Sequence, residues 1–570
     1  MYLFLSRAML IGLLSISSVQ ASTINWDVLN TTVQGRLHTA KPLAFPCFSV
    51  YEGQTSPPDP ASCSRIQKNY TSSDFRAQFY SGFTNSQDEI CLARAADQCL
   101  LDSSVPTDVL AFGANKSCDQ GSVSPYYIDV QSVGDVQAAF NFSSATGVSL
   151  SIKNSGHDYL GRSSFKGSLA LWVRNLRDIS RNPAFIPEGC YGVEGTDTIT
   201  TGAGVNSDEV YRFADQQNVT FVGGYATTIG VSGGWVQGGG HSVLSPVYGL
   251  GIDRTVQFKV VTPDGVFRVA NSCQNQDLFW ALKGGGGGTF GVVMEATHRV
   301  DPNTPLTVAY IKYSQNSANI GRWLEIVVEN GLQWAKQGWG GHYVASNIIS
   351  VTPLLNLSEA TASMEPAATF ARSNNGSVVI EILPSWYSFY IKYVIPNQAP
   401  VGTLRFLASR LIPASLFETA TGQAKLLSFL NHLVDVGFSP YIPATAPYLF
   451  PYAANSTSAT PAWRDSIWEL GMGAGLAWNS TVAQRQATID LQRNLTQMAE
   501  EMTPGGGSYL NEALPWISDW QASWWGDNYP RLLEIKKKYD PHGLLKCWKC
   551  VGFEEQISNT SFPCFSAFGA

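Results

Sequence analysis

Apolar and polar residues are distributed along the chain in two patterns, which together predict an α+β fold. From residue 125 onward, short apolar runs typical of strands are separated by segments with helical spacing. Strands are predicted at 126–130, 148–153, 169–173, 198–204, 256–261 and 292–300. A helix is predicted over 133–146, between the first two of these strands. We therefore expect a domain of sheets and helices over residues 121–303.

A second domain is predicted over residues 306–510. Pro302 and Pro305 mark its start, because proline interrupts both helices and sheet ladders. Strand-like runs follow at 308–313 and 378–383, and helices are predicted at 321–328 and 482–502. After the glycines at 505–507, a last helix is predicted over 529–539, ended by Pro541 and Gly543.

The first 120 residues differ in texture from the rest. Arg7 precedes the apolar run 8–16, and Val19-Gln20-Ala21 is typical of a signal-peptide cleavage site, so residues 1–21 are predicted to be a signal peptide. Residues 22–120 hold five of the ten cysteines and predict an irregular extension stapled by disulfides, with a helix near 88–101. Eleven Asn-x-Ser/Thr sequons agree with a secreted glycoprotein; they lie at Asn30, Asn69, Asn115, Asn141, Asn218, Asn356, Asn375, Asn455, Asn479, Asn494 and Asn559.

Composition excludes several classes of protein. Charged residues make up 14% of the chain, and the net charge of −7 shows no basic stripe, so nucleic acid is not an expected partner. The apolar run near the N-terminus is too short to cross a bilayer and no later run is longer, so no membrane span is predicted. Cys547-Trp548-Lys549-Cys550 has the spacing of a redox or zinc motif. Since neither a second such pair nor a histidine cluster accompanies it, a structural disulfide is favoured and no metal site is predicted.

Three glycine-rich stretches carry the candidate chemistry. Ser155-Gly156-His157 is followed by Gly161 and Ser163, residues 223–251 contain ten glycines, and a third run covers 284–288. Glycine allows positive φ angles and lets backbone N–H groups approach an anion, and a pyrophosphate needs both. The runs do not fit a P-loop, and Gly202-x-Gly204 lacks the third glycine of a dinucleotide fingerprint. A large phosphorylated cofactor is therefore predicted, and a Rossmann-type nicotinamide site is disfavoured.

These motifs resemble those of the FAD-linked oxidases of the vanillyl-alcohol-oxidase superfamily, in the branch of berberine-bridge-like and isoamyl-alcohol-oxidase-like secreted fungal enzymes. The resemblance covers roughly residues 120–302 and 505–546. Besides the glycine motifs, it rests on 278–288, Tyr509-Leu510-Asn511 and 525–532. It implies a two-part FAD-binding domain of the PCMH type. It further implies a substrate domain with a mainly antiparallel sheet covered by helices, and a C-terminal segment, residues 511–570, that returns to the FAD domain.

The resemblance also implies FAD attached covalently to the His157 imidazole. Many relatives have a second, cysteinyl bond, but Ala226 stands at the corresponding position, so a single link is predicted. Ile229 occupies a position thought to control oxygen access and is bulkier than the usual valine, which leaves the final electron acceptor open. The residues predicted to bind the cofactor are Ser155, Gly156, His157, Gly161, Ser163, Thr228, Gly230, Gly233, Gly234, Gly238, Gly239, Gly240 and Asn528.

Tyr509 and Glu512 are the candidate catalytic residues. Their segment, Tyr509-Leu510-Asn511-Glu512, is similar to a family Tyr-x-Asn-Tyr motif, with a carboxylate in place of the second phenol. A carboxylate is the better base at neutral or acidic pH, although Glu512 could also be an ordinary exposed loop residue. For His241 a structural hydrogen bond is expected. Asp158 and Tyr159 are assigned no catalytic role, and Arg531 is expected to serve cofactor contact or helix packing.

The predicted function is oxidation of an alcohol or an activated C–H or C–N bond in a small organic molecule or secondary metabolite. Hydride would pass to the flavin N5 and electrons then to dioxygen, giving hydrogen peroxide. Two enzymatic alternatives remain: a redox-neutral isomerase or cyclase that uses Glu512 as general acid and base, and a carbohydrate oxidase. A secreted flavin- or carbohydrate-binding glycoprotein without turnover is the non-enzymatic alternative. A monomer is expected, and residues 306–510 contain no motif that identifies the substrate.

Overall fold

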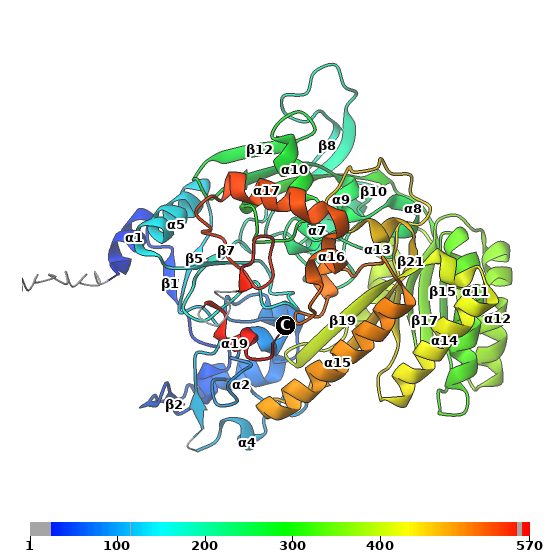
Figure 1. The fold of residues 1–570 in the computed structure, drawn as a ribbon, viewed down its shortest axis with the longest axis horizontal. Helices are drawn as coiled ribbons and strands as arrows, with labels where there is room; N and C mark the ends of the chain where they lie inside the picture. Colours follow the sequence, from blue (N-terminus) through cyan, green and yellow to red (C-terminus); the bar gives the residue numbers. More distant parts are fainter. Residues whose placement is uncertain (1–23, 115, 556–560, 570) are drawn as a thin grey trace, which may run out of the picture.

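The computed structural model describes residues 24–114, 116–555 and 561–569. The predicted signal peptide and the sequons at Asn115 and Asn559 lie outside the described residues. The chain forms an α+β molecule with three main sheets, as expected (Figure 1).

Two sheets form the core of the first domain. One has the strand order β1-β5-β7-β6, with β5, β7 and β6 parallel, and the other has the antiparallel order β12-β11-β13-β9-β8. Their strands are β1 (Leu37–Thr39), β5 (Tyr126–Asp129), β6 (Leu150–Lys153), β7 (Leu169–Trp172), β8 (Ile179–Phe185), β9 (Thr196–Gly202), β11 (Thr255–Val261), β12 (Phe267–Asn271) and β13 (Val292–Arg299). The helices are α5 (Val133–Thr146), α6 (Ser207–Gln216), α7 (Gly234–Gln237), α8 (Ser245–Tyr248), α9 (Gly251–Arg254) and α10 (Gln276–Leu282). The predicted strands and the helix over 133–146 are confirmed.

Helix α5 has clear signals for its start, its end and its buried side in the sequence. Ser132 and Asp135 form a capping box at its start, and Gly147 ends it with a φ of 74°. Its apolar side buries Val136 and Phe140 against the strands of the first sheet.

The N-terminal extension is more closely joined to the first domain than its composition indicates. Strand β1 pairs with β5, so residues 37–39 belong to the first sheet. The helix expected over 88–101 is absent: this segment holds only the end of η2 (Ser86–Asp88) and turns. Disulfides at Cys91 and Cys99 fix the backbone there in irregular conformation. The other elements are α1 (Trp26–Thr32), η1 (Phe45–Cys47), β2 (Val50–Tyr51), β3 (Gln54–Thr55), α2 (Pro60–Asn69), α3 (Ser73–Arg76), α4 (Val109–Phe112) and β4 (Ser117–Cys118).

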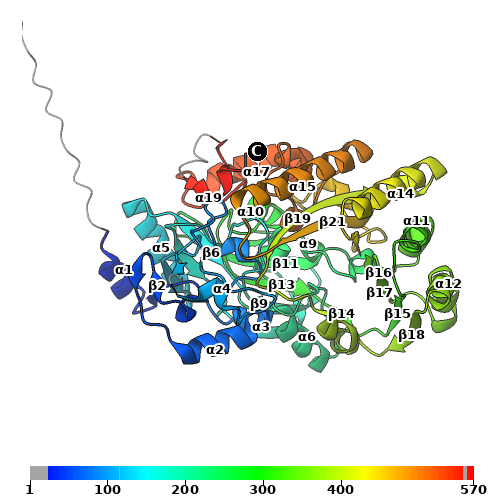
Figure 2. The same cartoon turned by 90° about the horizontal axis from the view of Figure 1, so that it is seen from below.

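The second domain contains one seven-stranded sheet in the order β18-β15-β17-β16-β20-β21-β19. All its pairings are antiparallel, and helices cover it, as expected (Figure 2). The strands are β15 (Leu306–Lys312), β16 (Gly340–Val344), β17 (Asn347–Thr352), β18 (Ser377–Leu383), β19 (Leu404–Pro413), β20 (Tyr441–Ala444) and β21 (Ser466–Leu476). The helices are α11 (Ile320–Lys336), α12 (Leu357–Ser373), α13 (Trp386–Phe389), α14 (Ala420–Asp435) and α15 (Val482–Met502). Helix α11 is longer than predicted because its buried face continues to Trp334 and Ala335.

The C-terminal segment returns to the first domain through α16 (Trp520–Trp525), α17 (Tyr529–Tyr539) and α19 (Pro563–Ser566). In Figure 1, α17 lies beside α10 of the first domain. The buried Lys536 ammonium on α17 also joins this segment to the first domain, because it donates to the backbone oxygen of Thr289; within its own segment it donates to Leu545 and pairs with Asp540 at 2.6 Å.

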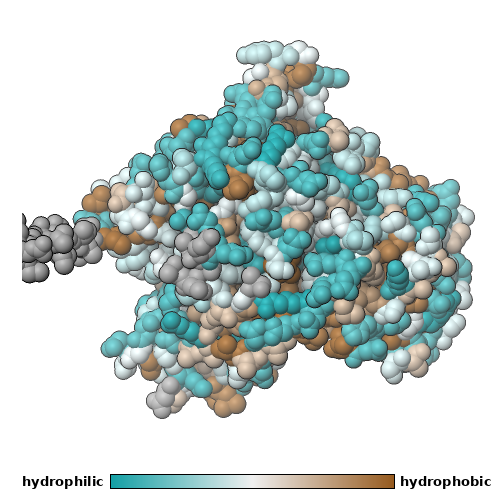
Figure 3. All heavy atoms as spheres, in the orientation of Figure 1, coloured by the Kyte–Doolittle hydropathy of each residue, from teal (hydrophilic) through white to brown (hydrophobic). Residues whose placement is uncertain are grey.

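All ten cysteines form disulfides: Cys47–Cys63, Cys91–Cys564, Cys99–Cys118, Cys190–Cys273 and Cys547–Cys550. The expectation of a disulfide in the Cys547 motif is confirmed. Cys91–Cys564 joins the N-terminal extension to the C-terminal segment across 473 residues. None of the helices in the described ranges has the length and apolar character of a membrane span. The face seen in Figure 3 mixes hydrophilic and hydrophobic side chains.

The disulfide between the two ends of the chain should stabilise the C-terminal segment. We expect the double variant Cys91→Ser/Cys564→Ser to lose about 2–4 kcal/mol there, because the cross-link limits the conformations of the unfolded chain. Limited proteolysis followed by mass spectrometry would detect earlier cleavage after residue 540. The variant Cys47→Ser/Cys63→Ser, which opens a short loop in the extension, is the control. Equal C-terminal resistance in the wild type and the first variant would contradict the prediction.

Candidate active site

His157 lies on the loop that follows β6, next to the segment that carries Thr228. The His157 Nε2 atom is 2.6 Å from the Thr228 hydroxyl, and Thr228 is buried. Burial, aided by the positive charge of Lys153, lowers the pKa of His157 to about 4. The imidazole is therefore neutral at neutral pH and has a free electron pair for bond formation.

Asp158 holds the shape of the His157 loop. Its carboxylate accepts hydrogen bonds from the backbone N–H groups of Leu160, Arg162 and Ser163 at 2.6–2.9 Å. It also accepts the Ser163 hydroxyl at 2.9 Å. Ser163 is thus engaged within the loop, and Asp158 has a structural part, in keeping with its exclusion from catalysis.

The other two glycine runs approach each other beside this loop. A Cβ added to Gly287 would lie 2.9 Å from the Cα of Gly234, so the two backbones are in close contact. Gly234 is exposed, and a Cβ added there or at Gly288 would meet nothing within 4 Å. Open space therefore adjoins both runs.

Several of the predicted glycines are explained by protein packing. A Cβ at Gly161 would lie 2.0 Å from the Phe565 ring, and one at Gly238 would lie 2.2 Å from the Asn511 Oδ1 atom. A Cβ at Gly230 or at Gly233 would collide with the Asn154 side chain. These positions need glycine for contacts between segments, whether or not they also contact a cofactor.

A cluster of acid–base groups lies where the two domains and the C-terminal segment meet. Glu512 ends η7 (Leu510–Glu512), and its Oε1 atom is 3.0 Å from the His241 Nε2 atom. The same nitrogen is 3.9 Å from the Oε2 atom of Glu469 on β21. Burial opposes the charged form of His241, but the hydrogen bond and charge of Glu512 act against it, as would an ionised Glu469, and the pKa of His241 is raised overall. The hydrogen bond expected for His241 is present, and Glu512 is not a freely exposed loop residue.

Comparison with known proteins identifies the fold and the chemistry. Residues 124–271 match the family described as FAD binding domain, and residues 508–547 match the family described as berberine and berberine like. An FAD-linked oxidoreductase of Aspergillus flavipes, ffsJ, is 45% identical over 96% of both chains. The crystal structure of the VAO-type flavoprotein MtVAO615 of Myceliophthora thermophila superposes with a TM-score of 0.82 at 28% identity, covering 95% of this chain and 96% of that one. A glucooligosaccharide oxidase of Acremonium strictum, described with a 6-S-cysteinyl, 8α-N1-histidyl FAD, shares the fold with a TM-score of 0.62 at 20% identity, covering 75% of this chain and 92% of that one.

This chain is a VAO-type FAD-linked oxidoreductase. FAD needs room beside the glycine runs and polar groups that can face it, and the structure has both. Open space adjoins Gly234 and Gly288, and the buried Asn154 Oδ1 and Gln237 Oε1 atoms have no hydrogen-bond partner within the described part of the chain. The residues present therefore fit the cofactor that the family binds.

Tyr509 holds its phenolic proton more tightly than an exposed tyrosine does. It is buried, and burial followed by the charge of Glu512 raises the pKa of its phenol. Its oxygen accepts the Asn511 amide at 2.8 Å, and its ring meets the His241 ring edge-on at 4.9 Å. The Tyr509 ring thus packs against one side of the acid–base cluster.

Two other predicted residues make packing contacts. Asn528 donates to the Ala459 carbonyl at 3.0 Å, and the Arg531 guanidinium lies 4.0 Å from the centre of the Trp280 ring. Sequence reasoning missed Glu469, because it lies on a strand without a recognisable motif. Glu469 stands among the apolar residues of β21 and is buried with them. A charged residue within an apolar strand is the sequence feature that could have indicated a functional role.

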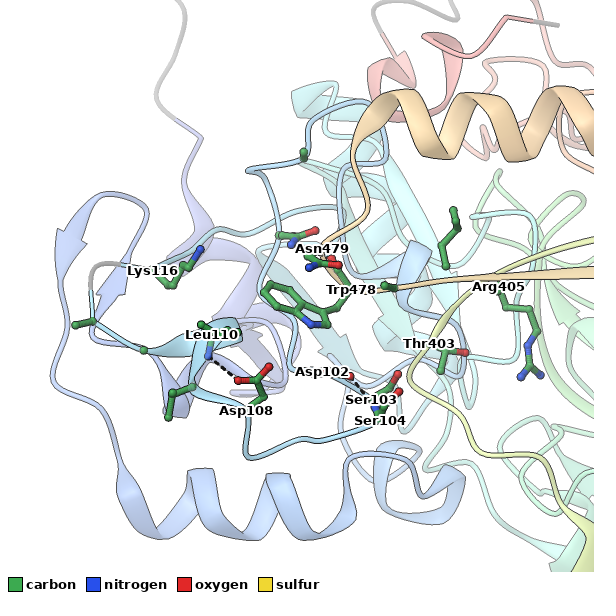
Figure 4. Close-up of a pocket in the computed structure, with 18 residues that line it drawn as sticks. Asp102, Ser103, Ser104, Asp108, Leu110, Lys116, Thr403, Arg405, Trp478 and Asn479 are labelled. Carbon is green, nitrogen blue, oxygen red and sulfur yellow. Dashed lines mark hydrogen bonds between the residues drawn. The ribbon is translucent and has the colours of Figure 1, made fainter.

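A groove of about 1060 Å³ lies elsewhere, between the N-terminal extension and the ends of β19 and β21 (Figure 4). Trp478 and Asn479 line it, with Asp102 and Asp108 opposite. Arg405 lies at one end and points away from Trp478. The lining includes neither His157 nor Glu512, so the groove is separate from the acid–base cluster.

The Asp158 contacts predict a measurable loss of stability. We expect Asp158→Ala to lower the free energy of unfolding by about 2–4 kcal/mol, since three backbone donors lose a charged acceptor. Thermal unfolding of wild type and variant would measure the loss. Asp435→Ala, at an exposed position of α14, should change stability little. An unchanged unfolding temperature for Asp158→Ala would show that the loop does not depend on this carboxylate.

Proposed function

We propose that this enzyme oxidises an alcohol or an activated C–H or C–N bond of a small organic molecule or secondary metabolite. The observation that supports it best is the Glu512 carboxylate, hydrogen-bonded to His241 at 3.0 Å and 18% exposed in its side chain. A carboxylate that is held in place and still reachable can accept a proton from a substrate O–H, N–H or C–H group. When bound, FAD would accept the hydride, and dioxygen would take up the electrons to give hydrogen peroxide.

Within this proposal Glu512 is the base and Tyr509 shapes the substrate side. His241 donates its Nε2–H to the Glu512 carboxylate, which orients the acceptor oxygen. The buried Tyr509 ring packs against His241 and limits its movement. We infer that Ser155, Gly156 and Thr228 support the cofactor around His157.

His157 is the proposed attachment residue, through a single covalent link. Its neutral imidazole supports this role, because the nucleophilic nitrogen must carry a free electron pair. All ten cysteines are paired, so no thiol is free for a second bond, and Ala226 stands where many relatives place a cysteine. The remaining predicted residues, Gly161, Ser163, Gly230, Gly233, Gly234, Gly238, Gly239, Gly240 and Asn528, are proposed to shape the cradle.

A second candidate is a redox-neutral isomerisation or cyclisation with Glu512 as general acid and base. The bifunctional decalin synthase calF of Penicillium decumbens, 29% identical over 95% of this chain and 92% of that protein, favours it. Both candidates use a small-molecule substrate and the same carboxylate. They differ in whether electrons reach the cofactor.

We also propose that the protein is secreted, N-glycosylated and monomeric. Five disulfides support an oxidising compartment, where such bonds form and persist.

His157→Ala should abolish covalent attachment. After denaturation and filtration, the wild-type protein should keep its yellow chromophore, whereas the variant should release it, because no second link holds the flavin. Absorbance of the filtrate at the flavin maximum measures the difference. His432→Ala, on helix α14, is the control and should retain the chromophore. Retention by His157→Ala would contradict the single link, and colourless wild-type protein would contradict a flavoprotein function.

Glu512→Gln should lower turnover by roughly 10²–10⁴-fold, the usual contribution of a general base. A screen of alcohols and amines for peroxide formation would supply the substrate, and kcat/KM would then be compared between variants. Glu418→Gln, at an exposed position, should match the wild type. Anaerobic addition of substrate distinguishes the two candidates: loss of the yellow colour supports oxidation, and an unchanged colour with product formed supports the redox-neutral reaction.

A further inference from the structure

Glu469 lies in surroundings that strongly disfavour an ionised carboxylate without a partner. Its side chain is 0% exposed, and neither of its oxygens has a hydrogen-bond partner within the described part of the chain. Transfer of an isolated carboxylate out of water is very costly, so such a group keeps its proton unless an opposite charge or a donor stabilises it.

His241 and Glu512 lie beside Glu469, and the buried Ser409 hydroxyl also acts on its carboxyl group. One side-chain atom from each of Glu469, His241 and Glu512 lies within 4.8 Å of the other two. Two carboxyl groups at this separation repel when both are ionised, and the group with the poorer surroundings takes up a proton first. Glu512 has the better surroundings, since its side chain is 18% exposed and is 3.0 Å from His241 Nε2, compared with 3.9 Å for Glu469.

We propose that Glu469 is a positioning acid for Glu512: a neutral carboxylic acid on β21 that leaves the His241 Nε2–H to Glu512 and keeps Glu512 the ionised member of the pair. This inference rests on the proposed role of Glu512 as base and adds a residue from the substrate domain to it. When Glu469 loses its proton, the second negative charge competes for the His241 N–H group, and Glu512 loses its orienting donor.

The electrostatic surroundings of Glu469 agree with a protonated Glu469 and an ionised Glu512. Burial, followed by the charge of Glu512, raises the pKa of Glu469 to about 8. Burial also raises the pKa of Tyr159 to about 12 and raises those of Tyr441 and Tyr509.

The other histidine and arginine side chains near Glu469 do not change protonation near pH 8. Burial and the charge of His241 lower the pKa of His342 to about 3. Arg405, whose charge acts on Tyr159, is a permanent cation. Glu469 is therefore the group of this cluster to which a change near pH 8 is assigned.

A bound cation is the competing explanation for three such groups. Histidines that bind metals almost always donate their second ring nitrogen to another group. His241 Nδ1 is buried and has no partner among the residues that the structure describes. A proton on Glu469 is therefore favoured over a bound cation.

Infrared difference spectroscopy of the holoprotein tests the proton on Glu469 without a substrate. Between pH 5 and 10, we expect a protonated-carboxyl band in the wild type that disappears near pH 8 and is absent from Glu469→Gln. Asp88→Asn is the matched control, since Asp88 is equally buried with neither oxygen partnered in the described chain, and the variant should keep the titrating band. Persistence of that band in Glu469→Gln, or its loss in Glu512→Gln instead, would overturn the proposal.

The pH dependence of kcat/KM tests the link to Glu512. Above about pH 8 the wild type should lose roughly tenfold per pH unit, as for a single ionisation, and Glu469→Gln should lack this limb. If Glu469→Gln does not fold, Glu469→Asp should shift the limb, and an unshifted limb would refute the idea. Activity lost to a chelator and restored by Zn²⁺ would establish a cation instead. Unchanged turnover in Glu512→Gln would refute the proposed base, while the infrared result would still decide the state of Glu469.

Discussion

The loop that carries His157 is fixed by contacts from both ends of the chain, and the geometry of the proposed cofactor site depends on it. Gly156 has a φ of 89° and leaves room for the backbone at Gly82 and Phe83 of the N-terminal extension. At the other end of the loop, Arg162 donates to the backbone oxygens of Trp548 and Lys549 in the C-terminal segment. Asp158 holds the turns between these two contacts. A neutral histidine can thus be presented in one orientation on a segment that has no regular structure.

This constraint explains why the two ends of the chain are cross-linked to each other. Cys91 follows the segment that supports Gly156, and Cys564 precedes Phe565, which packs on Gly161. The disulfide keeps both supports together, so movement of one terminal segment requires movement of the other. The extension is therefore part of the architecture of the site, although it lies outside the matched FAD-binding region, residues 124–271.

Periodicity predicted the main strands and helix α5, because these depend on local patterns. The reasons for individual glycines could not be predicted. At Gly161 and Gly238 a side chain would collide with Phe565 and Asn511, which are distant in sequence. The same limit applied to residues 88–101, where the chain forms turns and Cys91 and Cys99 are bonded to the distant Cys564 and Cys118. Glu512 could be found because its segment resembles a motif. Glu469 could not, since nothing local shows that β21 places it beside His241.

The acid–base cluster draws its members from three parts of the chain, and this arrangement separates the proposed proton transfer from the proposed attachment of the cofactor. His241 follows a glycine run of the first domain, Glu512 lies on the C-terminal segment, and Glu469 lies on the sheet of the substrate domain. The proton affinity of the cluster therefore depends on the position of the substrate domain relative to the first domain. The conformation of the His157 loop depends instead on its contacts with the two ends of the chain. Substitutions on β21 can then alter the chemistry at Glu512 without disturbing the support of His157. A scaffold of this kind can host both oxidation and redox-neutral proton transfer, because the two reactions differ in what the cluster does to the substrate and not in how the cradle is built.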